Sequence, residues 1–288
     1  MTLDFTWTRE RADGENPMIK MNYFVEGIQG AGKSTLVRRL SEQWKDFQIF
    51  HEGDYSPVEL AWCAYMTETQ YVEILKKYPS LEGEISVVTV EEDGKRIVCY
   101  TRVITDIIGF HKDLEQYEIY NGRMDRQAFE KIILSRYAKW NGEGQIFECS
   151  LFQNIVESQI LYYEMSDDEV LDFYVRVKQA LGDQNYQIFY LDAENIAENL
   201  QIIRKERVDE EGNEMWFPMM MRYVEESPYG ARHGLKGFEG LLAHLERRRN
   251  LELRLLREVF AEHAVILKSK AYELKDLLIE KGIMSEGG

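Results

Sequence analysis

The sequence predicts an α/β fold centred on a parallel β-sheet of five strands. Near the N-terminus, a β-rich run, an amphipathic helical pattern and a second β-rich run follow one another between residues 21 and 52. This succession is typical of a βαβ unit, which implies parallel strands and a right-handed crossover. Three further apolar runs, at 145–150, 185–193 and 264–269, are each followed by a helical pattern, which brings the predicted strands to five.

The first two predicted strands are residues 21–26, which stop at a glycine, and residues 47–52. Apolar residues recur at helical spacing from Leu36 to Phe47, so the segment between the two strands is predicted to be the crossover helix. Residues 1–18 have no periodicity and contain a turn-like cluster of Asp, Gly, Asn and Pro. We predict that they form a disordered lead-in, and that the domain proper covers 19–288.

The next hundred residues interrupt the alternation of strands and helices. Residues 60–78 have a helical pattern that ends near Pro79, and residues 124–140 have another. Between them, two β-patterned runs within 84–104 flank Glu92-Asp93-Gly94, a turn signal that favours a hairpin. We therefore predict a helical and hairpin insertion between the second and third strands, over 58–143.

The last part of the chain returns to the alternating pattern. The strand predicted at 185–193 leads into a helix that runs through Ile202, and the strand at 264–269 leads into a terminal helix that reaches about Lys281. No internal repeat interrupts this part of the sequence. These elements complete the predicted five-stranded sheet.

Composition excludes several classes of protein. The 288 residues include 35 basic and 51 acidic side chains, and the net charge of −16 argues against a nucleic-acid partner, whose phosphates would be repelled. Three widely spaced cysteines predict neither a disulfide framework nor a zinc site. No apolar run is long enough to span a membrane, and the N-terminus is acidic where a signal peptide is basic. We expect a cytoplasmic protein without a membrane anchor.

The strongest chemical signal is GIQGAGKST at 27–35, which fits the phosphate-loop motif GxxxxGK[ST]. The predicted strand before it and the predicted helix after it supply the structural context that the mechanism requires. Glycines let the backbone wrap a phosphate, and successive N–H groups at the helix N-terminus then converge on the anion. The residues expected to bind a nucleotide are Gly27, Gly30, Ala31, Gly32, Lys33, Ser34 and Thr35. Lys33 is expected to reach the β- and γ-phosphates, and Ser34 to ligate Mg²⁺.

Other motifs narrow the class of phosphate-loop protein. The Asn-Lys-x-Asp motif of a switch GTPase is missing from the sequence, and no Asp-Glu pair follows a hydrophobic strand as in motor or AAA-type ATPases. Four segments together resemble the nucleoside and nucleotide kinase branch of P-loop proteins, which includes deoxynucleoside kinases, nucleoside monophosphate kinases and antibiotic phosphotransferases. These segments are GIQGAGKST, HEGDYSP at 51–57, FECS at 147–150 and the strand, helix and basic stretch at 190–207.

The resemblance implies a three-layer α/β/α sandwich with strand order 2-3-1-4-5. It implies an ATP-dependent kinase that uses Mg²⁺ and recognises its acceptor through the insertion at 58–143. In this family a carboxylate at the position of Glu148 holds Mg²⁺ through water, and an arginine-bearing lid closes over the triphosphate. The resemblance thereby places the lid at about 203–237, with Arg204 and Arg207 as its catalytic residues and Lys205 as a weaker candidate.

Acidic residues at the end of the second strand are candidates for the catalytic base. Residues at the carboxyl ends of parallel strands face the crevice where ligands bind. Asp54 or Glu52 is therefore expected to accept a proton from, or to orient, the acceptor hydroxyl, and Asp54 is slightly favoured because it lies beyond the strand end. The alternative is that both are solvated loop acids. A denser basic run, Arg247 to Arg249, is interpreted as the solvated face of an amphipathic helix, and the alternative is that one of these arginines faces the nucleotide site.

The sequence therefore predicts an ATP-dependent small-molecule kinase that transfers the γ-phosphoryl group to a nucleoside, a nucleotide or a similar hydroxyl-bearing acceptor. An antibiotic-modifying phosphotransferase is the alternative within enzymes, and an NTP-binding regulator or NTPase is the alternative outside kinases. The sequence does not identify the acceptor, and it leaves open whether the chain forms a homodimer.

Overall fold

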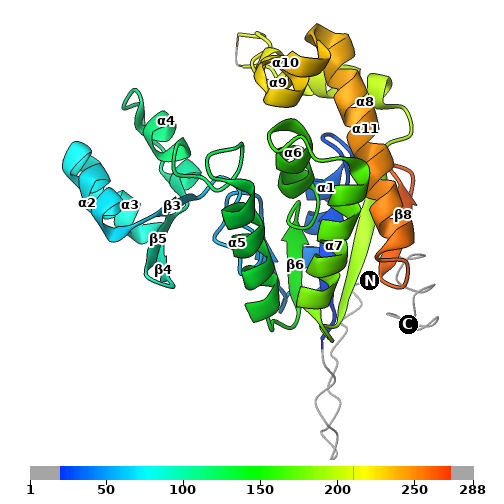
Figure 1. Ribbon diagram of the computed structural model, residues 1–288, viewed down its shortest axis with the longest axis horizontal. Helices are drawn as coiled ribbons and strands as arrows, with labels where there is room; N and C mark the ends of the chain where they lie inside the picture. Colours follow the sequence, from blue (N-terminus) through cyan, green and yellow to red (C-terminus); the bar gives the residue numbers. More distant parts are fainter. Residues whose placement is uncertain (1–19, 210, 274–288) are drawn as a thin grey trace, which may run out of the picture.

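The computed structural model describes residues 20–209 and 211–273. A sheet of five parallel strands forms the centre of the molecule (Figure 1). The strands lie in the order β2-β6-β1-β7-β8. Counted along the chain within this sheet alone, the order reads 2-3-1-4-5, because β3, β4 and β5 belong to a second sheet. Its strands are β1 (Asn22–Glu26), β2 (Gln48–Phe50), β6 (Gln145–Glu148), β7 (Tyr186–Asp192) and β8 (Ala264–Lys268).

The register of the sheet brings the chemically interesting strand ends together. All five residues of β1 are buried, as expected for a central parallel strand whose two faces are covered. Val25 of β1 lies opposite Glu148 of β6 on one side and Phe189 of β7 on the other. Glu148 therefore ends its strand next to the loop that follows β1.

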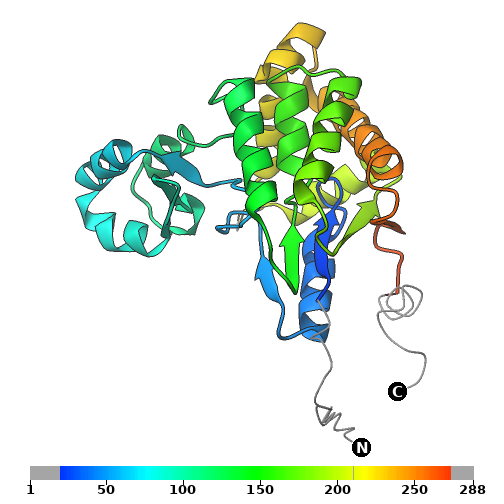
Figure 2. The ribbon, with the colours of Figure 1, turned by 60° about the horizontal axis from the view of Figure 1, so that its bottom comes forward.

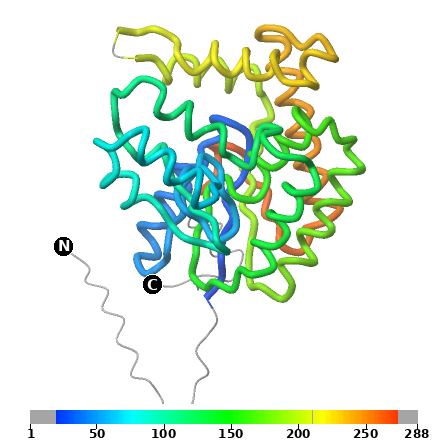
Figure 3. The backbone as a smooth tube through the Cα atoms, turned by 60° about the vertical axis from the view of Figure 1, so that its left-hand side comes forward, coloured from blue at the N-terminus to red at the C-terminus, as the bar shows by residue number. Residues whose placement is uncertain are grey.

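Helices flank this sheet, and α1 contacts both β1 and β6. Helices α5, α6 and α7 run side by side in Figures 1 and 2, and α5 packs on α7. The segment from α8 to α10 lies along the top of the molecule in Figures 1 and 3. These helices are α1 (Lys33–Gln43), α5 (Arg126–Lys139), α6 (Gln153–Leu161), α7 (Asp167–Leu181), α8 (Ile196–Glu206), α9 (Trp216–Glu226), α10 (Pro228–His233) and α11 (Gly237–Glu258).

Residues 64–117, here called the insertion lobe, form a separate unit at the left of Figure 1. The lobe has its own buried cluster, which includes Met66, Ile85 and Phe110. A three-stranded antiparallel sheet of order β3-β5-β4 supports it. Its elements are β3 (Ala64–Met66), α2 (Glu68–Lys77), α3 (Glu82–Val87), β4 (Thr89–Glu92), β5 (Lys95–Val98) and α4 (Phe110–Glu115), with 3₁₀ turns at Pro79–Leu81 and Tyr100–Arg102.

Two element predictions in this region were wrong in part. The helix predicted over 60–78 begins only at Glu68, because a capping box of Thr67 and Gln70 fixes its first turn. The residues before it form β3, where Ala64 pairs with Val98 of β5. The hairpin exists, with its turn between β4 and β5, but residues 82–87 form a helix where the sequence predicted the start of a strand.

The predicted lead-in at 1–18 and the end of the predicted terminal helix lie outside the described residues. Within the described part of the chain, no helix combines the length and the apolarity needed to cross a lipid bilayer.

Glu59 is a buried carboxyl group in the loop that precedes the insertion lobe. It is 3% exposed, and its Oε1 accepts a hydrogen bond from Ala61 N at 2.6 Å. Burial raises the pKa of Glu59 to about 8, well above its ordinary value of 4.5. The folded protein therefore retains a proton that the unfolded chain releases near pH 4.5, and the resulting stabilisation is lost as the pH rises toward 8.

We expect Glu59→Gln to stabilise the protein more at pH 8.5 than at pH 5.5, by roughly 1–3 kcal/mol in the free energy of unfolding. Glutamine keeps an acceptor for Ala61 N and cannot ionise, so it removes the cost of the buried charge at high pH. Urea unfolding at the two pH values measures the difference. Glu73→Gln, on the exposed face of α2, is the control; an equal effect of Glu59→Gln at both pH values would contradict the assignment.

Candidate functional site

The loop between β1 and α1 has the backbone geometry that its sequence predicts. Gly27, Gly30 and Gly32 adopt φ values of +139°, +75° and +97°, which side chains other than glycine rarely tolerate. A Cβ atom on Gly30 would lie 2.2 Å from the Ile203 side chain of α8, so this position also needs glycine for space. The strand, the glycine-rich loop and the helix are therefore arranged as an anion-binding loop at the N-terminus of α1.

Lys33 begins α1 and is almost completely buried. Its Nζ donates hydrogen bonds to the carbonyl oxygens of Gly27 and Ile28, at 2.8 and 3.0 Å. The ammonium group therefore lies over the loop whose N–H groups would hold a phosphate, in the position expected for a charge that binds the β- and γ-phosphates. Ala31 and Thr35, the remaining members of the predicted set, lie in the same turn, and Thr35 lines the adjoining cavity.

Ser34 and Glu148 meet at the end of β6. Ser34 Oγ donates to Glu148 Oε1 at 2.5 Å, and His51 Nδ1 lies 2.8 Å from Glu148 Oε2. Within the described residues, no group of three or more His, Cys, Asp or Glu side chains could hold a metal by itself. The pair nevertheless fits Mg²⁺ in a nucleotide site, because this ion takes one or two protein oxygens and completes its shell with phosphates and water.

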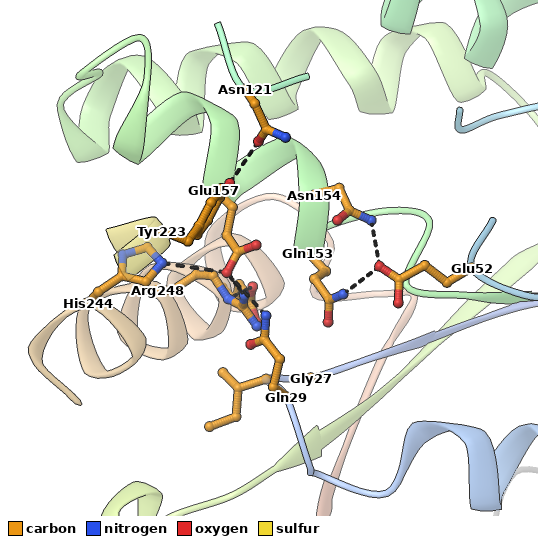
Figure 4. Close-up of polar contacts among 12 residues, drawn as sticks. Gly27, Gln29, Glu52, Asn121, Gln153, Asn154, Glu157, Tyr223, His244 and Arg248 are labelled. Carbon is orange, nitrogen blue, oxygen red and sulfur yellow. Dashed lines mark hydrogen bonds and ion pairs between the residues drawn. The ribbon is translucent and has the colours of Figure 1, made fainter. Parts of the chain in front are cut away.

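The two acids after β2 have different surroundings. Glu52 Oε1 accepts a hydrogen bond from Trp62 Nε1 at 3.0 Å. It also accepts from Gln153 Nε2 at 2.9 Å and from Asn154 Nδ2 at 3.3 Å (Figure 4). All three bonds end on Glu52 Oε1. No described residue donates a hydrogen bond to Glu52 Oε2, so this oxygen can accept one from the hydroxyl group of a substrate.

Asp54, which the sequence slightly favours as the base, is engaged elsewhere. Its Oδ1 forms an ion pair with Arg102, and its Oδ2 accepts from His51 N at 2.9 Å. Asp54 is not among the described residues that line the cavity shared by Glu52 and the phosphate loop. The geometry favours Glu52.

A cavity of about 1040 Å³ connects these groups. Its walls come from the phosphate loop, the loop after β2, the insertion lobe, α6 and α9. Its lining residues include Gln29, Lys33, Ser34, Glu52, Trp62, Glu115, Glu118, Tyr120, Asn121, Arg123, Glu148, Gln153, Asn154, Glu157, Glu206, Arg207, Trp216, Met219, Met220, Tyr223 and Lys270. The cavity is large enough for a nucleotide and a small second substrate.

The predicted lid residues separate into two groups. Arg207 ends α8, lines the cavity, and stacks on Trp216 with its guanidinium 4.8 Å from the ring centre. Arg204 points to Glu214, with 2.5 Å between Arg204 Nε and Glu214 Oε1, and stacks on Phe217. The structure thus places Arg207 at the site and gives Arg204 a contact within the lid region.

We expect Arg207→Ala to slow turnover about 10- to 100-fold while nucleotide affinity changes less, because a guanidinium that acts on the transferring group stabilises mainly the transition state. The measurement is kcat beside the Kd for ATP. Arg204→Ala removes the same charge three residues earlier on α8 and should leave kcat within about twofold; equal effects of the two substitutions would remove Arg207 from the mechanism.

A buried ion cluster beside the phosphate loop is not predicted by the sequence. Arg248 of α11 is fully buried and contacts Glu157 of α6 at 2.6 Å and Glu252 at 3.0 Å. Glu157 Oε1 also accepts from Gln29 of the phosphate loop at 3.1 Å, and His244 lies 3.5 Å away (Figure 4). The cluster therefore links the phosphate loop to α6 and α11.

The interpretation of Arg247–Arg249 as a solvated face was wrong for Arg248. Burial alone would raise the pKa of Glu157, but the charge of Arg248 and the contact with His244 outweigh it and lower the pKa to about 2. Glu157 is therefore ionised and holds the arginine in place. The one signal in the sequence is a run of three arginines among apolar helical positions, which does not indicate which arginine turns inward.

No protein-family model and no curated protein matches the sequence. Among solved structures, a gluconokinase from Sinorhizobium meliloti 1021 is similar at 11% sequence identity and a TM-score of 0.32, with 91% of this chain and 89% of that chain covered. A likeness at this score carries no argument about fold or activity. The functional conclusion therefore depends on the geometry of the site itself.

Proposed function

We propose that the protein is an ATP-dependent small-molecule kinase that transfers the γ-phosphoryl group to a hydroxyl group of its acceptor. The observation that carries this proposal is the cavity of about 1040 Å³ that joins the phosphate loop to Glu52. Both features lie at the carboxyl ends of strands in one parallel sheet, where such folds bind ligands. ATP as the nucleotide follows from the sequence resemblance.

The phosphate loop and Lys33 would hold and neutralise the triphosphate. Phosphoryl transfer needs positioning and charge neutralisation more than covalent help from the protein. Ser34 would ligate Mg²⁺ directly and Glu148 through water, and the bound ion would supply further neutralisation of the phosphate oxygens. The 2.5 Å contact between Ser34 and Glu148 keeps these two oxygens on the same side of the loop.

Glu52 would act on the acceptor. Its Oε1 is fixed by three donors from Trp62, Gln153 and Asn154, which orients the carboxylate and leaves Oε2 to accept the proton of the attacking hydroxyl. Arg207 would stabilise charge that develops on the transferring group. The aromatic and methionine side chains of α9 close the cavity on the lid side; they are Trp216, Met219, Met220 and Tyr223.

The same fold and site are compatible with two alternative functions. An antibiotic-modifying phosphotransferase would use the same groups on a different acceptor, so only a substrate screen separates it from a nucleoside or nucleotide kinase. An NTP-binding regulator would hydrolyse the nucleotide in response to a protein partner. A carboxylate held by three donors on the acceptor side of the cavity favours transfer to a small molecule over hydrolysis.

The test is ATP consumption in the presence of Mg²⁺ across pooled acceptors: nucleosides, nucleotides, sugars, amino sugars and hydroxylated antibiotics. We expect one pool to raise ATP consumption at least about tenfold above the rate without acceptor, because water is a poor substitute for a positioned hydroxyl. Subdividing that pool identifies the acceptor. ATP binding with no stimulation by any pool would contradict the kinase proposal and favour the regulator.

A further inference from the structure

The charges of the cavity are unevenly distributed. Its lining includes six glutamates and four lysines or arginines. Lys33 belongs to the phosphate loop, Arg207 ends α8, and Lys270 lies beside Gly32 of the loop. The remaining cation, Arg123, lies on the side of the cavity that the insertion lobe forms, where it pairs with Glu115 of α4. We call this side the acceptor half, comprising the lining residues between 52 and 123 together with Gln153 and Asn154.

The acceptor half carries a net negative charge. Three of its lining residues are glutamates, namely Glu52, Glu115 and Glu118. Arg123 forms an ion pair with Glu115, so its charge is already matched. The groups that donate hydrogen bonds to Glu52 and Glu118 are neutral, and Tyr100 Oη donates to Glu118 Oε1 at 2.5 Å. Neither carboxylate forms an ion pair among the described residues, although Arg123 lies near enough to Glu118 to favour its ionised form.

A buried amide gives a second, independent indication. Gln153 is 5% exposed and lines the cavity, and its Oε1 has no hydrogen-bond partner among the residues described. Its Nε2 donates to Glu52, which fixes the amide so that the oxygen is the group left unmatched. A buried acceptor without a donor is costly, and a ligand that donates a hydrogen bond removes that cost.

These features indicate the chemistry of the acceptor. Two unmatched atoms of the acceptor half, Glu52 Oε2 and Gln153 Oε1, only accept hydrogen bonds, and a third, Tyr120 Oη, can donate or accept. Together they fit a ligand rich in O–H and N–H groups. A phosphate or carboxylate on the acceptor would need an unpaired cation there, and Arg123 is already paired. An ammonium group, in contrast, would be attracted by Glu118 and by the net negative half-cavity.

We propose that the acceptor is a small hydroxyl-bearing amine, such as an amino sugar or an amino alcohol, whose ammonium group binds at Glu118 while one hydroxyl reaches Glu52. This inference rests on the proposed kinase function. The acceptor oxygen forms a bond to the γ-phosphorus, the bond from that phosphorus to the β,γ-bridging oxygen breaks, ADP leaves, and the hydroxyl proton passes to Glu52.

The environment of Glu118 agrees with this assignment. The side chain is 3% exposed, and burial raises the pKa of Glu118 to about 7, so its negative charge is costly near neutral pH. A neighbouring ammonium group favours the ionised form and removes this cost. The carboxyl is also anchored by Tyr100, which keeps it at the cavity wall.

The experiment compares acceptors of different charge. Amino sugars and amino alcohols, with glucosamine as the reference, are assayed beside their N-acetyl derivatives, the parent neutral sugars, nucleosides and nucleoside monophosphates. We expect kcat/KM for the best amine to exceed that of its N-acetyl derivative about 10- to 100-fold, the range of a hydrogen-bonded charge contact. A neutral or anionic acceptor with the highest kcat/KM would overturn the inference and leave the kinase proposal standing.

Substitution at Glu118 tests the residue itself. Glu118→Gln should raise KM for the amine about 10- to 100-fold, with kcat within about threefold and with KM for the N-acetyl derivative unchanged. Glu73→Gln, on the exposed face of α2, removes the same charge outside the cavity and should change neither KM. Equal effects of Glu118→Gln on the amine and on its N-acetyl derivative would overturn the assignment of the ammonium site.

Thermal unfolding with the same amines in the absence of ATP separates the two proposals. If no acceptor stimulates ATP consumption, the kinase proposal fails. An amine-dependent rise in Tm that Glu118→Gln abolishes would then still support the cation site, since a ligand that binds only the folded state raises stability. The absence of any such rise would overturn the inference as well.

Discussion

Lys33→Ala is expected to lower the rate of phosphoryl transfer about 10³-fold, close to the background of the assay. Lys33 supplies a buried positive charge in the phosphate loop, and its Nζ lies within 2.8 Å of Gly27 O. In the proposed mechanism this charge neutralises the β- and γ-phosphates as the terminal bond breaks. Alanine removes the charge and keeps the helix, because alanine has the highest helix propensity.

The measurement is acceptor-dependent ATP consumption, with circular dichroism and thermal unfolding of the same preparation. Loss of Lys33 leaves two backbone carbonyl groups without their donor but leaves no unpaired charge, so we expect a cost of about 1–3 kcal/mol and a folded protein. Lys131→Ala, at an exposed position of α5, is the matched control and should retain full activity. Turnover by folded Lys33→Ala at the unaltered rate would refute the phosphate-loop mechanism.

Glu52→Gln is the second substitution for which we expect a large effect, a fall in kcat of about 10²- to 10⁴-fold. Glutamine is close in size to glutamate and can still accept the bonds from Trp62, Gln153 and Asn154 through its oxygen. It presents an NH₂ group, which cannot accept a proton, where glutamate presents Oε2 to the acceptor hydroxyl. The affinity for ATP should stay within about threefold, since Glu52 does not belong to the phosphate loop.

Asp54→Asn is the matched control, because it removes a carboxylate two residues away in the same loop. Asp54 is paired with Arg102 and does not line the cavity, so we expect at most a severalfold change in kcat. The kinetic comparison of the two variants therefore decides the base. A fall in kcat for Asp54→Asn that exceeds the fall for Glu52→Gln would return the role to Asp54.

Local patterns were sufficient to predict the main sheet. Each of its strands is a short apolar run next to a helical pattern, and the burial of these strands follows from their residue types. The phosphate loop was equally predictable, because its conformation depends on glycines at fixed spacing within one segment. The errors lie in the insertion lobe, where the capping box at Thr67 and the pairing of β3 with β5 override the local pattern at 60–66.

The sequence by itself determined the strand–loop–helix unit and the chemistry of its residues, because these depend on neighbours close along the chain. Only the tertiary structure favours Glu52 over Asp54 as the candidate base, because Glu52 is oriented by Gln153, 101 positions away. It also turned Arg248 inward to Glu157, 91 positions away, and brought Glu118 to the wall of the same cavity. Charge pairing and burial arise where distant segments pack together, and no pattern of neighbouring residues encodes which carboxylate finds a partner there.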